Sequence, residues 1–344
     1  VDGASFSERN GRFTLGAALA IKARVLLYAA SPLHNPDNDV EKWKKAAAAA
    51  YDIISNPDLN YSLDSDYGAY FQGNRSLSSP ETIYVVRREQ SNAMESNNYP
   101  IATPGGASGV TPTQNLVEAY EWVGDPVAGD PYANRDPRLA ASVVTNGSTW
   151  NGHVIDQSPG GRHDMSAPNA SKTGYYLKKF LTDNLDLTQG AKVQHNWVSY
   201  RYAEVLLNYA EAMNEAYGPD QAPGDYALTA LDALQLVRDR ASLQLPIVTA
   251  ATRDEFREAV KHERRIELAF EDHRYWDLLR WKDAMEVLNK PVRGVKVTKT
   301  GEGKWSYTQT EVATRTFLER NYYMPFTRSE VENSNHTLEQ NPGY

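Results

Sequence analysis

The chain of 344 residues carries a net charge of −8, and 41% of its residues are hydrophobic. It is therefore long enough for one large domain or two, with a substantial core. Disulfides, thiolate metal sites and a cysteine nucleophile are excluded, because the chain contains no cysteine. An acidic chain without a basic patch does not favour nucleic acid as a partner, and no apolar run reaches the roughly 18 residues that span a bilayer.

Two helices are expected near the start of the chain. Residues 14–30 show a helical pattern rich in alanine, which ends before Pro32. A second pattern, also rich in alanine, covers residues 38–54. Because alanine faces let two helices approach closely, residues 14–55 are expected to form a helical hairpin that belongs to a scaffold.

Residues 56–192 have a different texture, with many Gly, Pro, Asn, Ser and Tyr residues. Short strands are expected at 82–87, 139–144 and 174–180, and a short helix at 111–120. Long loops inside a compact domain are usually either functional or disordered. This segment is therefore the predicted binding face.

The same segment places flat aromatic side chains beside amides and a guanidinium. A sugar presents C–H faces and a ring of hydroxyls, so a sugar site needs both kinds of side chain. The candidate ligand-binding residues are Tyr70, Arg75, Asn97, Asn98, Tyr99, Trp150 and His153, with Tyr67, Phe71 and Asn151 on the same face. Tyr99 and Trp150 are the expected stacking platforms. The alternative is that both rings pack the loops onto the helical body, as single aromatic residues commonly do.

The helical pattern returns after residue 199. Residues 200–217 and 225–242 are expected to form a second hairpin, separated by glycine and proline residues. The two hairpins could stack as tetratricopeptide-like repeats, although no strict repeat of about 34 residues is visible. Residues 200–290 are therefore predicted to complete the helical scaffold.

A third helix is predicted to pack against these hairpins. Thr252 and Glu255 form a capping box that starts it. Phe256, Val260 and Phe270 fall on one apolar stripe. In the run that follows, apolar area is so dense that Tyr275, Trp276 and Trp281 are all expected to be buried.

Two carboxylates, Glu263 and Glu267, interrupt that apolar stripe, and Arg264 lies on its flank. A carboxylate in apolar surroundings is costly unless it is paired, so Arg264 or an arginine from another helix is expected to bind it. Arg201, at the head of the helical residues 201–216, is the predicted partner of Glu263 or Glu267. Ion pairs that join helices are favoured over a catalytic carboxylate pair, since structural networks resemble catalytic ones.

Residues 291–344 are predicted to form a β-hairpin and a tail. The hairpin covers residues 294–316, with its turn at residues 300–303. Across the whole chain, no metal-binding, phosphate-binding or nucleophile motif is present, so no cofactor and no metal are predicted.

Several blocks of sequence together resemble the SusD/RagB family of nutrient-binding lipoproteins, which lie on the surface of certain Gram-negative bacteria. The blocks are HERRIELAFEDHRYWDLLRW at 262–281, RYAEVLLNYAEAMNEA at 201–216, YYMPFTRSEVENSNHTLEQNPGY at 322–344, TLGAALAIKARVLLYAASPLHN at 14–35 and TPTQNLVEAYE at 111–121. The resemblance implies a mainly α fold, with tetratricopeptide-like hairpins and a loop-rich, partly β subdomain. Residues 1–344 would form one such domain without its N-terminal part and without the lipid-bearing cysteine.

The resemblance also implies a function. The protein would bind an oligosaccharide or polysaccharide at the surface of the outer membrane without catalysis, and deliver it to a TonB-dependent importer. A peptide nutrient is an alternative ligand, and membrane contact would be made only through a lipid anchor that this sequence lacks. Two other classes remain open: a helical-repeat scaffold for protein interactions and a glycoside hydrolase that uses two of the many carboxylates.

Overall fold

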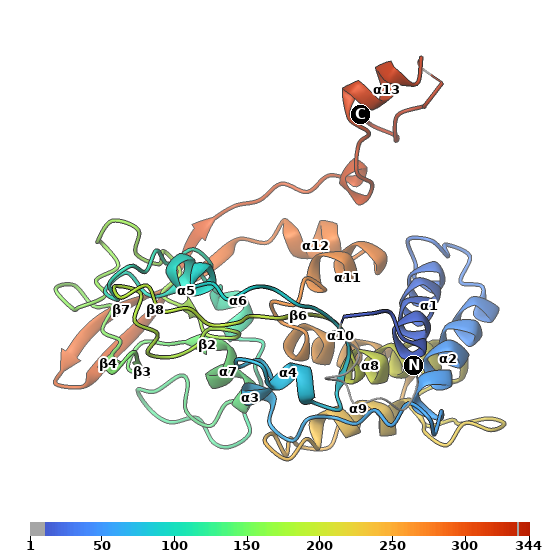
Figure 1. Cartoon of the computed structure of the whole chain (residues 1–344), viewed down its shortest axis with the longest axis horizontal. Helices are drawn as coiled ribbons and strands as arrows, with labels where there is room; N and C mark the ends of the chain where they lie inside the picture. Colours follow the sequence, from blue (N-terminus) through green and yellow to red (C-terminus); the bar gives the residue numbers. More distant parts are fainter. Residues whose placement is uncertain (1–10, 336) are drawn as a thin grey trace.

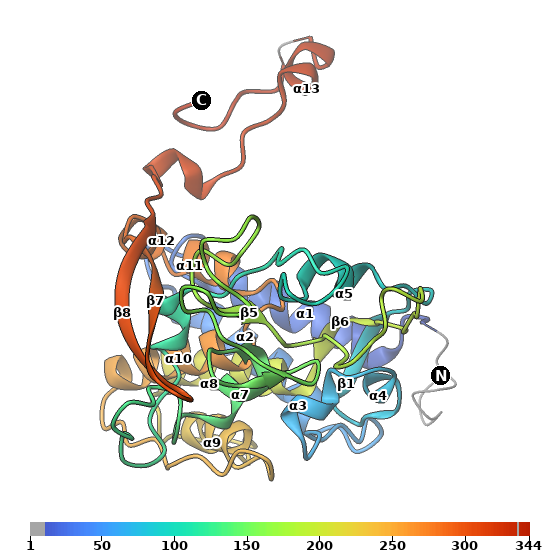
Figure 2. The ribbon, with the colours of Figure 1, turned by 90° about the vertical axis from the view of Figure 1, so that its left-hand side faces the viewer.

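The computed structural model describes residues 11–335 and 337–344. Long helices gather on one side of the body and loops with short strands on the other, while the C-terminal segment extends away from both (Figures 1 and 2). The expected mainly α fold with a loop-rich, partly β part is confirmed. Within the described ranges, no helix has the length and apolar character needed to cross a bilayer.

Five helices form the scaffold and its core: α1 (Leu15–Ala30), α2 (Val40–Ile54), α8 (Tyr202–Tyr217), α9 (Ala230–Arg238) and α10 (Arg253–Glu267). Helix α2 packs between α1 and α8, and α8 also contacts α9 and α10. Ala47 and Ala50 of α2 are fully buried in this core, because their small side chains let the helices approach closely. The predicted capping box of Thr252 and Glu255 starts α10.

The loop-rich part contains short elements: α3 (Tyr67–Tyr70), α4 (Arg75–Ser78), β1 (Thr82–Val86), α5 (Ala93–Asn98), α6 (Gln114–Val117), α7 (Pro137–Ser142), β2 (Val143–Val144), β3 (Thr149–Trp150), β4 (His153–Val154), β5 (Tyr176–Leu177) and β6 (Trp197–Arg201). Strands β1 and β6, β2 and β5, and β3 and β4 form three antiparallel pairs. The pair β1–β6 joins distant parts of the chain, and β6 leads directly into α8.

Several expected elements are wrong in part: the helix expected at 111–120 covers only Gln114–Val117, and the strand expected at 174–180 covers only Tyr176–Leu177. The strand expected at 139–144 is mostly the helix α7, because Asp136 caps it and Pro137 occupies its first position; only Val143 and Val144 are extended. The helix expected from residue 200 begins at Tyr202, because the residues before it pair with β1.

The last part of the chain begins with α11 (Arg274–Arg280) and α12 (Ala284–Leu288), followed by β7 (Val292–Gly301), β8 (Lys304–Ala313), η2 (Glu319–Tyr322) and α13 (Arg328–Asn333). Strands β7 and β8 form the predicted hairpin. Val295 and Val297 of β7 are buried against Val117, Tyr120 and Tyr175 in a second core cluster. The hairpin is thereby fixed along the loop-rich part, and its turn lies at the far end from the C-terminal segment (Figure 1).

The expectations for the segment after α10 need correction. Helix α10 ends at Glu267, and Phe270, which was expected on its stripe, has a φ of 65° in the turn that follows. Tyr275 and Trp276 are 40% and 44% exposed, although both were expected to be buried. They occupy the first turn of the short α11, and burial begins only at the next residue, Asp277.

Candidate functional site

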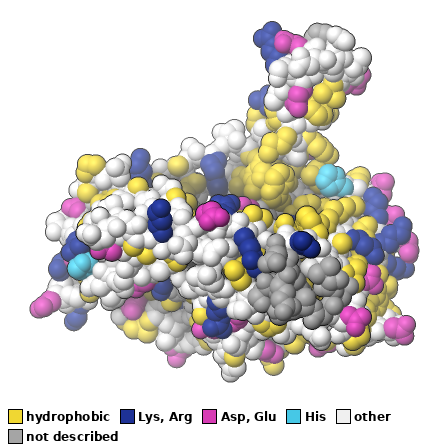
Figure 3. Space-filling model, in the orientation of Figure 1, with side chains coloured by type: hydrophobic (Ala, Val, Ile, Leu, Met, Phe, Trp, Pro, Cys, Tyr) yellow, Lys and Arg dark blue, Asp and Glu magenta, His cyan; other side chains and the backbone are white. Residues whose placement is uncertain are grey.

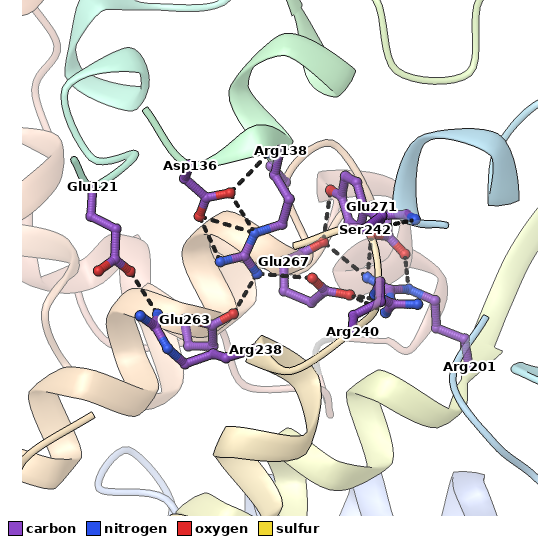
Figure 4. A network of polar contacts seen from close by, with 12 residues as sticks. Glu121, Asp136, Arg138, Arg201, Arg238, Arg240, Ser242, Glu263, Glu267 and Glu271 are labelled. Carbon is purple, nitrogen blue, oxygen red and sulfur yellow. Dashed lines mark hydrogen bonds and ion pairs between the residues drawn. The ribbon is translucent and has the colours of Figure 1, made fainter. Parts of the chain in front are cut away.

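A buried network of ion pairs surrounds the two carboxylates of α10 (Figure 4). Glu263 accepts hydrogen bonds from Arg138 of α7 and from Arg238 at the end of α9, the latter at 2.9 Å. Glu267 accepts from Arg138 at 2.9 Å. Arg238 also binds Glu121 at 2.6 Å. The network therefore ties α7, α9 and the loop before α7 to one face of α10.

Arg201 joins the same network from the end of β6. Its Nη1 lies 2.7 Å from Glu267 and 2.7 Å from Glu81, and its Nε lies 2.7 Å from Glu271. The expected ion pair between Arg201 and a carboxylate of α10 is thus present. Arg240 completes it with 2.9 Å to Glu267 and 2.6 Å to Glu81.

Arg264 is not a partner of either carboxylate, in contrast to one of the two possibilities that the sequence left open. Its Nε lies 3.0 Å from Asp277, and its Nη1 lies 2.6 Å from Asn208. The flank position of Arg264 turns it toward α8 and α11, whereas the arginines that reach Glu263 and Glu267 come from other segments.

The charges of the network determine its protonation. Burial alone would raise the pKa of Glu267, but the neighbouring charges of Arg240, Arg201 and Arg138 outweigh it and hold this pKa well below its ordinary value. Glu263 and Glu267 are buried. A carboxylate that is buried and held ionised by arginines, as Glu267 is, has neither the access nor the proton that a catalytic acid needs. The structural role of Glu263 and Glu267 remains a prediction, and this geometry favours it.

The three aromatic residues among the predicted ligand contacts are not exposed, so the expectation that they offer stacking faces is wrong. Tyr70, Tyr99 and Trp150 are 1%, 0% and 4% exposed. The Tyr70 hydroxyl lies 2.7 Å from Thr82 Oγ1. Tyr99 donates to the carbonyl of Thr182, and its ring packs edge-on against Trp150 at 6.0 Å. These rings are buried, as the alternative expected, but they fix the loops to one another rather than to the helical body.

Of the polar residues in the predicted site, one is buried and three are exposed. Asn98 is buried and accepts a hydrogen bond from the Val110 backbone at 2.9 Å. Arg75 on α4 is exposed and pairs with Asp64 at 2.6 Å. Asn97 on α5 and His153 on β4 are exposed as well. A role of Arg75, Asn97 or His153 in ligand binding remains a prediction.

The structure instead forms a cavity of about 650 Å³ at the turn of the β7–β8 hairpin. We call it the hairpin-tip pocket. Its walls are the loops at residues 128–133 and 145–148 and the hairpin residues 300 and 303–307. Three aromatic side chains, Tyr132, Trp305 and Tyr307, line it, and all three are partly exposed. The hairpin-tip pocket thus has the partly exposed rings that the predicted residues do not offer.

Trp305 and Tyr307 reach this cavity because they are two residues apart in β8 and therefore point to the same face. Trp305 Nε1 donates to Asp156 Oδ1 at 3.1 Å. Opposite the ring, Gly147 has a φ of 83°, and a Cβ there would lie 3.2 Å from the indole. The missing side chain at Gly147 lets the loop come close to the ring.

Tyr307 and Tyr132 form the second wall of the hairpin-tip pocket. Their rings meet edge-to-face at 5.3 Å. The Tyr307 hydroxyl accepts a hydrogen bond from Asn146 Nδ2 at 3.3 Å, and the Tyr132 hydroxyl donates to that of Tyr175 at 3.3 Å. Burial raises the pKa of Tyr307 above its ordinary value, so its hydroxyl stays protonated at neutral pH.

Sequence reasoning found one side of this pocket and missed the other. The two loops lie inside the predicted binding face, whereas Trp305 and Tyr307 belong to the hairpin, which was predicted as structure only. The alternation of Trp305, Tyr307 and Gln309 with small polar residues is the signal that could have placed two aromatic residues on one face. As for metals, no group of three His, Asp or Glu side chains within residues 11–335 and 337–344 is placed to hold an ion.

A family profile and the similar proteins found by sequence comparison all point to the same family. Residues 70–344 match the sequence profile of the SusD family. SusD-like protein P2 of Formosa agariphila is 25% identical over 313 residues, which cover 88% of this chain and 56% of that protein. SusD-like protein P38 of the same organism is 27% identical over 262 residues, or 71% of this chain and 46% of that protein. The chain therefore spans about half the length of these two relatives.

Solved structures share the fold. A SusD-like protein from Bacteroides fragilis superposes with a TM-score of 0.79 at 26% identity, covering 98% of this chain and 67% of that one. A SusD-like carbohydrate-binding protein from the same organism gives a TM-score of 0.76 at 27% identity, covering 94% of this chain and 65% of the other.

Proposed function

This chain belongs to the SusD family, and from that premise we propose that it binds a carbohydrate without cleaving it, with the hairpin-tip pocket as the binding site. The observation that carries the proposal is the set of three partly exposed rings, Tyr132, Trp305 and Tyr307, beside the amide of Asn146. A related protein of the same fold is described as carbohydrate-binding, which supports a glycan over a peptide.

The chemistry of the hairpin-tip pocket suits a sugar. A partly exposed aromatic face accepts the C–H face of a pyranose ring, and the indole of Trp305 is held in place by Asp156. Around the rings, Asn146, Ser148 and Lys304 supply donors and acceptors for hydroxyl groups. A cavity of about 650 Å³ lies within the range typical of small-ligand sites, about 300–1,000 Å³.

The same pocket does not favour glycoside hydrolysis. Glycosidases flank the scissile bond with two carboxyl groups about 5–9.5 Å apart. Among the described residues that line the hairpin-tip pocket, Asp130 is the single carboxylate. Its Oδ1 already accepts the backbone N–H groups of Tyr132 and Ala133, at 2.9 Å and 3.2 Å. We therefore place the protein among binding proteins rather than enzymes.

The proposal extends to location and partner. As a SusD-family protein, the whole molecule would lie at the surface of the outer membrane and present captured glycan to a TonB-dependent transporter. Tyr275, Trp276, Met285, Leu318 and Tyr323 are exposed hydrophobic side chains. Hydrophobic side chains gather where the C-terminal segment meets the body (Figure 3). This surface favours a protein contact, and a helical-repeat scaffold, the second candidate function, would use it too.

The test is native electrophoresis of the protein in gels that contain single polysaccharides, neutral and acidic, together with chromatography of oligosaccharides after incubation. We expect retardation by at least one polysaccharide and unchanged oligosaccharides. Shortened products would show a hydrolase, and the absence of retardation across the panel would favour the protein scaffold.

A further inference from the structure

A second cavity, of about 440 Å³, lies at the base of the β7–β8 hairpin, between the hairpin, α6, α11 and α12. We call it the basic pocket. Its walls carry five cationic side chains, Arg265, Arg274, Lys290, Arg293 and Arg315. No Asp or Glu occurs among the described residues that line it. The chain as a whole has a net charge of −8, so a cavity lined by five cations and no carboxylate differs in charge from the rest of the protein.

The cations of the basic pocket are only partly neutralised. Arg293 pairs with Glu118, and Lys290 lies 2.7 Å from Glu286. Arg265 donates to the backbone carbonyl of Asn115. Within the part of the chain that the structure describes, the side chains of Arg274 and Arg315 have no hydrogen bond and no ion pair. Two guanidinium groups therefore line the cavity without a directly bound carboxylate: Arg315 is exposed, and Asp277 and Asp283 act on Arg274 only from a distance.

Arg274 and Arg265 carry an electrostatic cost in the basic pocket. Burial lowers the pKa of Arg274 to about 10, and the neighbouring charge of Arg265 adds to the effect. Burial likewise lowers the pKa of Arg265 below its ordinary value. An anion in the basic pocket would relieve this cost, because an opposite charge favours the charged form of both side chains.

The floor of the basic pocket is apolar. Leu116, Phe270, Leu278 and Leu288 line it between the arginines. Apolar walls lower the local dielectric constant and so strengthen charge-assisted hydrogen bonds. They also suit a ligand that has C–H faces beside its charge. A guanidinium binds the planar oxygen pair of a carboxylate, and equally the oxygens of a sulfate group, in a bidentate manner.

The basic pocket and the hairpin-tip pocket lie on the same hairpin. Arg293 stands six residues before Lys299, which is the cross-strand partner of Trp305, and this corresponds to about 20 Å at 3.3 Å per residue. The two positions share a strand face, but Val295 and Val297, which lie between them on that face, are buried in the second core cluster, so a ligand that reaches both cavities has to pass around the hairpin. A glycan of several units is long enough to reach both cavities, whereas a free small anion would occupy only one.

We propose that the basic pocket binds an oxyanion-bearing sugar unit, a uronic acid or a sulfated sugar, of the glycan held in the hairpin-tip pocket. This inference rests on the proposed function and narrows its ligand to acidic polysaccharides. Arg274 and Arg315 bind the oxyanion, and the apolar floor contacts the sugar ring.

The test uses the whole chain and three small probes: D-glucuronate, D-glucose 6-sulfate and neutral methyl glucoside. Saturable binding is measured by calorimetric titration for the wild type, for Arg274→Gln/Arg315→Gln, and for Lys296→Gln/Arg328→Gln. The last variant is the matched control, because it removes two exposed cations outside the basic pocket. We expect at least one acidic probe to bind the wild type. Its affinity should fall tenfold or more in Arg274→Gln/Arg315→Gln and should be unchanged in the control variant. The two acidic probes distinguish carboxylate from sulfate.

Stability gives a second readout. Because Arg274 is partly buried without a partner, Arg274→Gln should keep or raise the melting temperature. A fall would show that Arg274 has a structural partner and would overturn the inference. Absence of saturable binding by both acidic probes, equal losses in both variants, or equal binding of methyl glucoside would overturn it as well. Trp305→Ala separates the two proposals: it should weaken polysaccharide retention and leave the binding of free acidic probes intact. If Trp305→Ala leaves retention unchanged, only the hairpin-tip site fails.

Discussion

Three arginines donate to the carboxylate of Glu267, and each comes from a different segment of the chain. Arg138 belongs to α7, Arg201 ends β6, and Arg240 follows α9. Removal of one member of a buried ion network leaves the other charges without compensation. Glu267 is therefore the residue at which the loop-rich part is most directly connected to the helical scaffold.

We expect Glu267→Ala to lower the free energy of unfolding by about 3–5 kcal/mol, because it would leave three buried arginines short of a partner. Glu258→Ala is the control, since the Glu258 side chain is 73% exposed on the same helix, and it should change stability by less than about 0.5 kcal/mol. Urea unfolding measures both variants. Equal stabilities of the two variants would contradict the structural role of Glu267.

Tyr99→Ala and Trp150→Ala should both destabilise the protein, the reverse of what exposed stacking platforms would do. Truncation of a buried aromatic side chain costs about 3–5 kcal/mol through lost burial and the cavity that remains. His153→Ala, which changes an exposed residue of the neighbouring strand β4, should leave the melting temperature nearly unchanged. Thermal melts that are identical for all three variants would show that the rings are not part of the core.

For single residues, the sequence predicted which buried carboxylates need arginine partners, but it did not predict which aromatic side chains are buried. Glu263 and Glu267 stood on an apolar stripe, so their need for arginine partners followed from desolvation alone. Tyr99 and Trp150 lie in polar loops without periodicity. In such loops the sequence pattern does not distinguish a buried aromatic residue from an exposed one. Phe270 lies outside α10 because its backbone is left-handed, a conformation that is uncommon for a bulky residue and that sequence rules do not predict.

The β7–β8 hairpin positions both cavities, and a close backbone contact at Gly294 adds to the burial of Val295 and Val297 that attaches it. A Cβ at Gly294 of β7 would lie 2.7 Å from Thr173 Cα. Real Cβ atoms do not come this close to backbone, so the absence of a side chain at Gly294 allows the hairpin to pack on the loop at Thr173. Val295 donates to the Thr173 carbonyl at 2.9 Å and secures the contact.

Gly294→Ala should therefore displace the hairpin and destabilise the protein by about 1–3 kcal/mol, the usual cost of overpacking. Gly301→Ala is the matched control in the same strand, because a Cβ there would meet its nearest neighbour, Lys304, only at 3.8 Å. Hydrogen exchange of β7 amides, together with urea unfolding, measures the effect. Equal protection of the β7 amides from hydrogen exchange in Gly294→Ala and Gly301→Ala would contradict this expectation.

Element boundaries show where local rules end. The helices α1, α2, α8, α9 and α10 were expected from periodicity and capping, and all are present. Strand β6 was missed because its pairing with β1 joins residues more than a hundred positions apart. Helix α7 was expected as a strand, although Asp136 and Pro137 are a helix-start signal. Contacts between distant segments, rather than local propensity, decide these elements.

At the scale of the whole molecule, buried ion pairs make stability depend on pH. Burial alone would raise the pKa of Glu204, but the charge of Arg24 outweighs it and lowers this pKa to about 2. The pKa of Asp277 is also lowered to about 2, since Arg264 and Arg280 outweigh its burial. Between pH 2 and the ordinary pKa of each group, both carboxyl groups bind fewer protons in the folded state than in the unfolded state. The stability that these two carboxylates contribute is therefore present above about pH 4.5 and is lost as the pH falls toward 2.

We expect the melting temperature to fall moderately from pH 7 to pH 5, because burial lowers the pKa of His163 to about 4 and also lowers the pKa values of His262 and His273. It should then fall steeply between pH 4.5 and pH 2, where Glu204 contributes about 3 kcal/mol. Differential scanning calorimetry at closely spaced pH values follows the loss. A melting temperature that stays constant down to pH 2.5 would show that these ion pairs do not stabilise the folded state.

The proposed hairpin-tip pocket holds a glycan through Trp305, and calorimetric titration with one retained oligosaccharide measures this interaction. Stacking on an aromatic side chain contributes through burial and contact, so Trp305→Ala should weaken binding at least tenfold. Trp276→Ala, the same change at an exposed tryptophan on α11, should bind like the wild type. Equal affinities of Trp305→Ala and the wild type would contradict this role of Trp305.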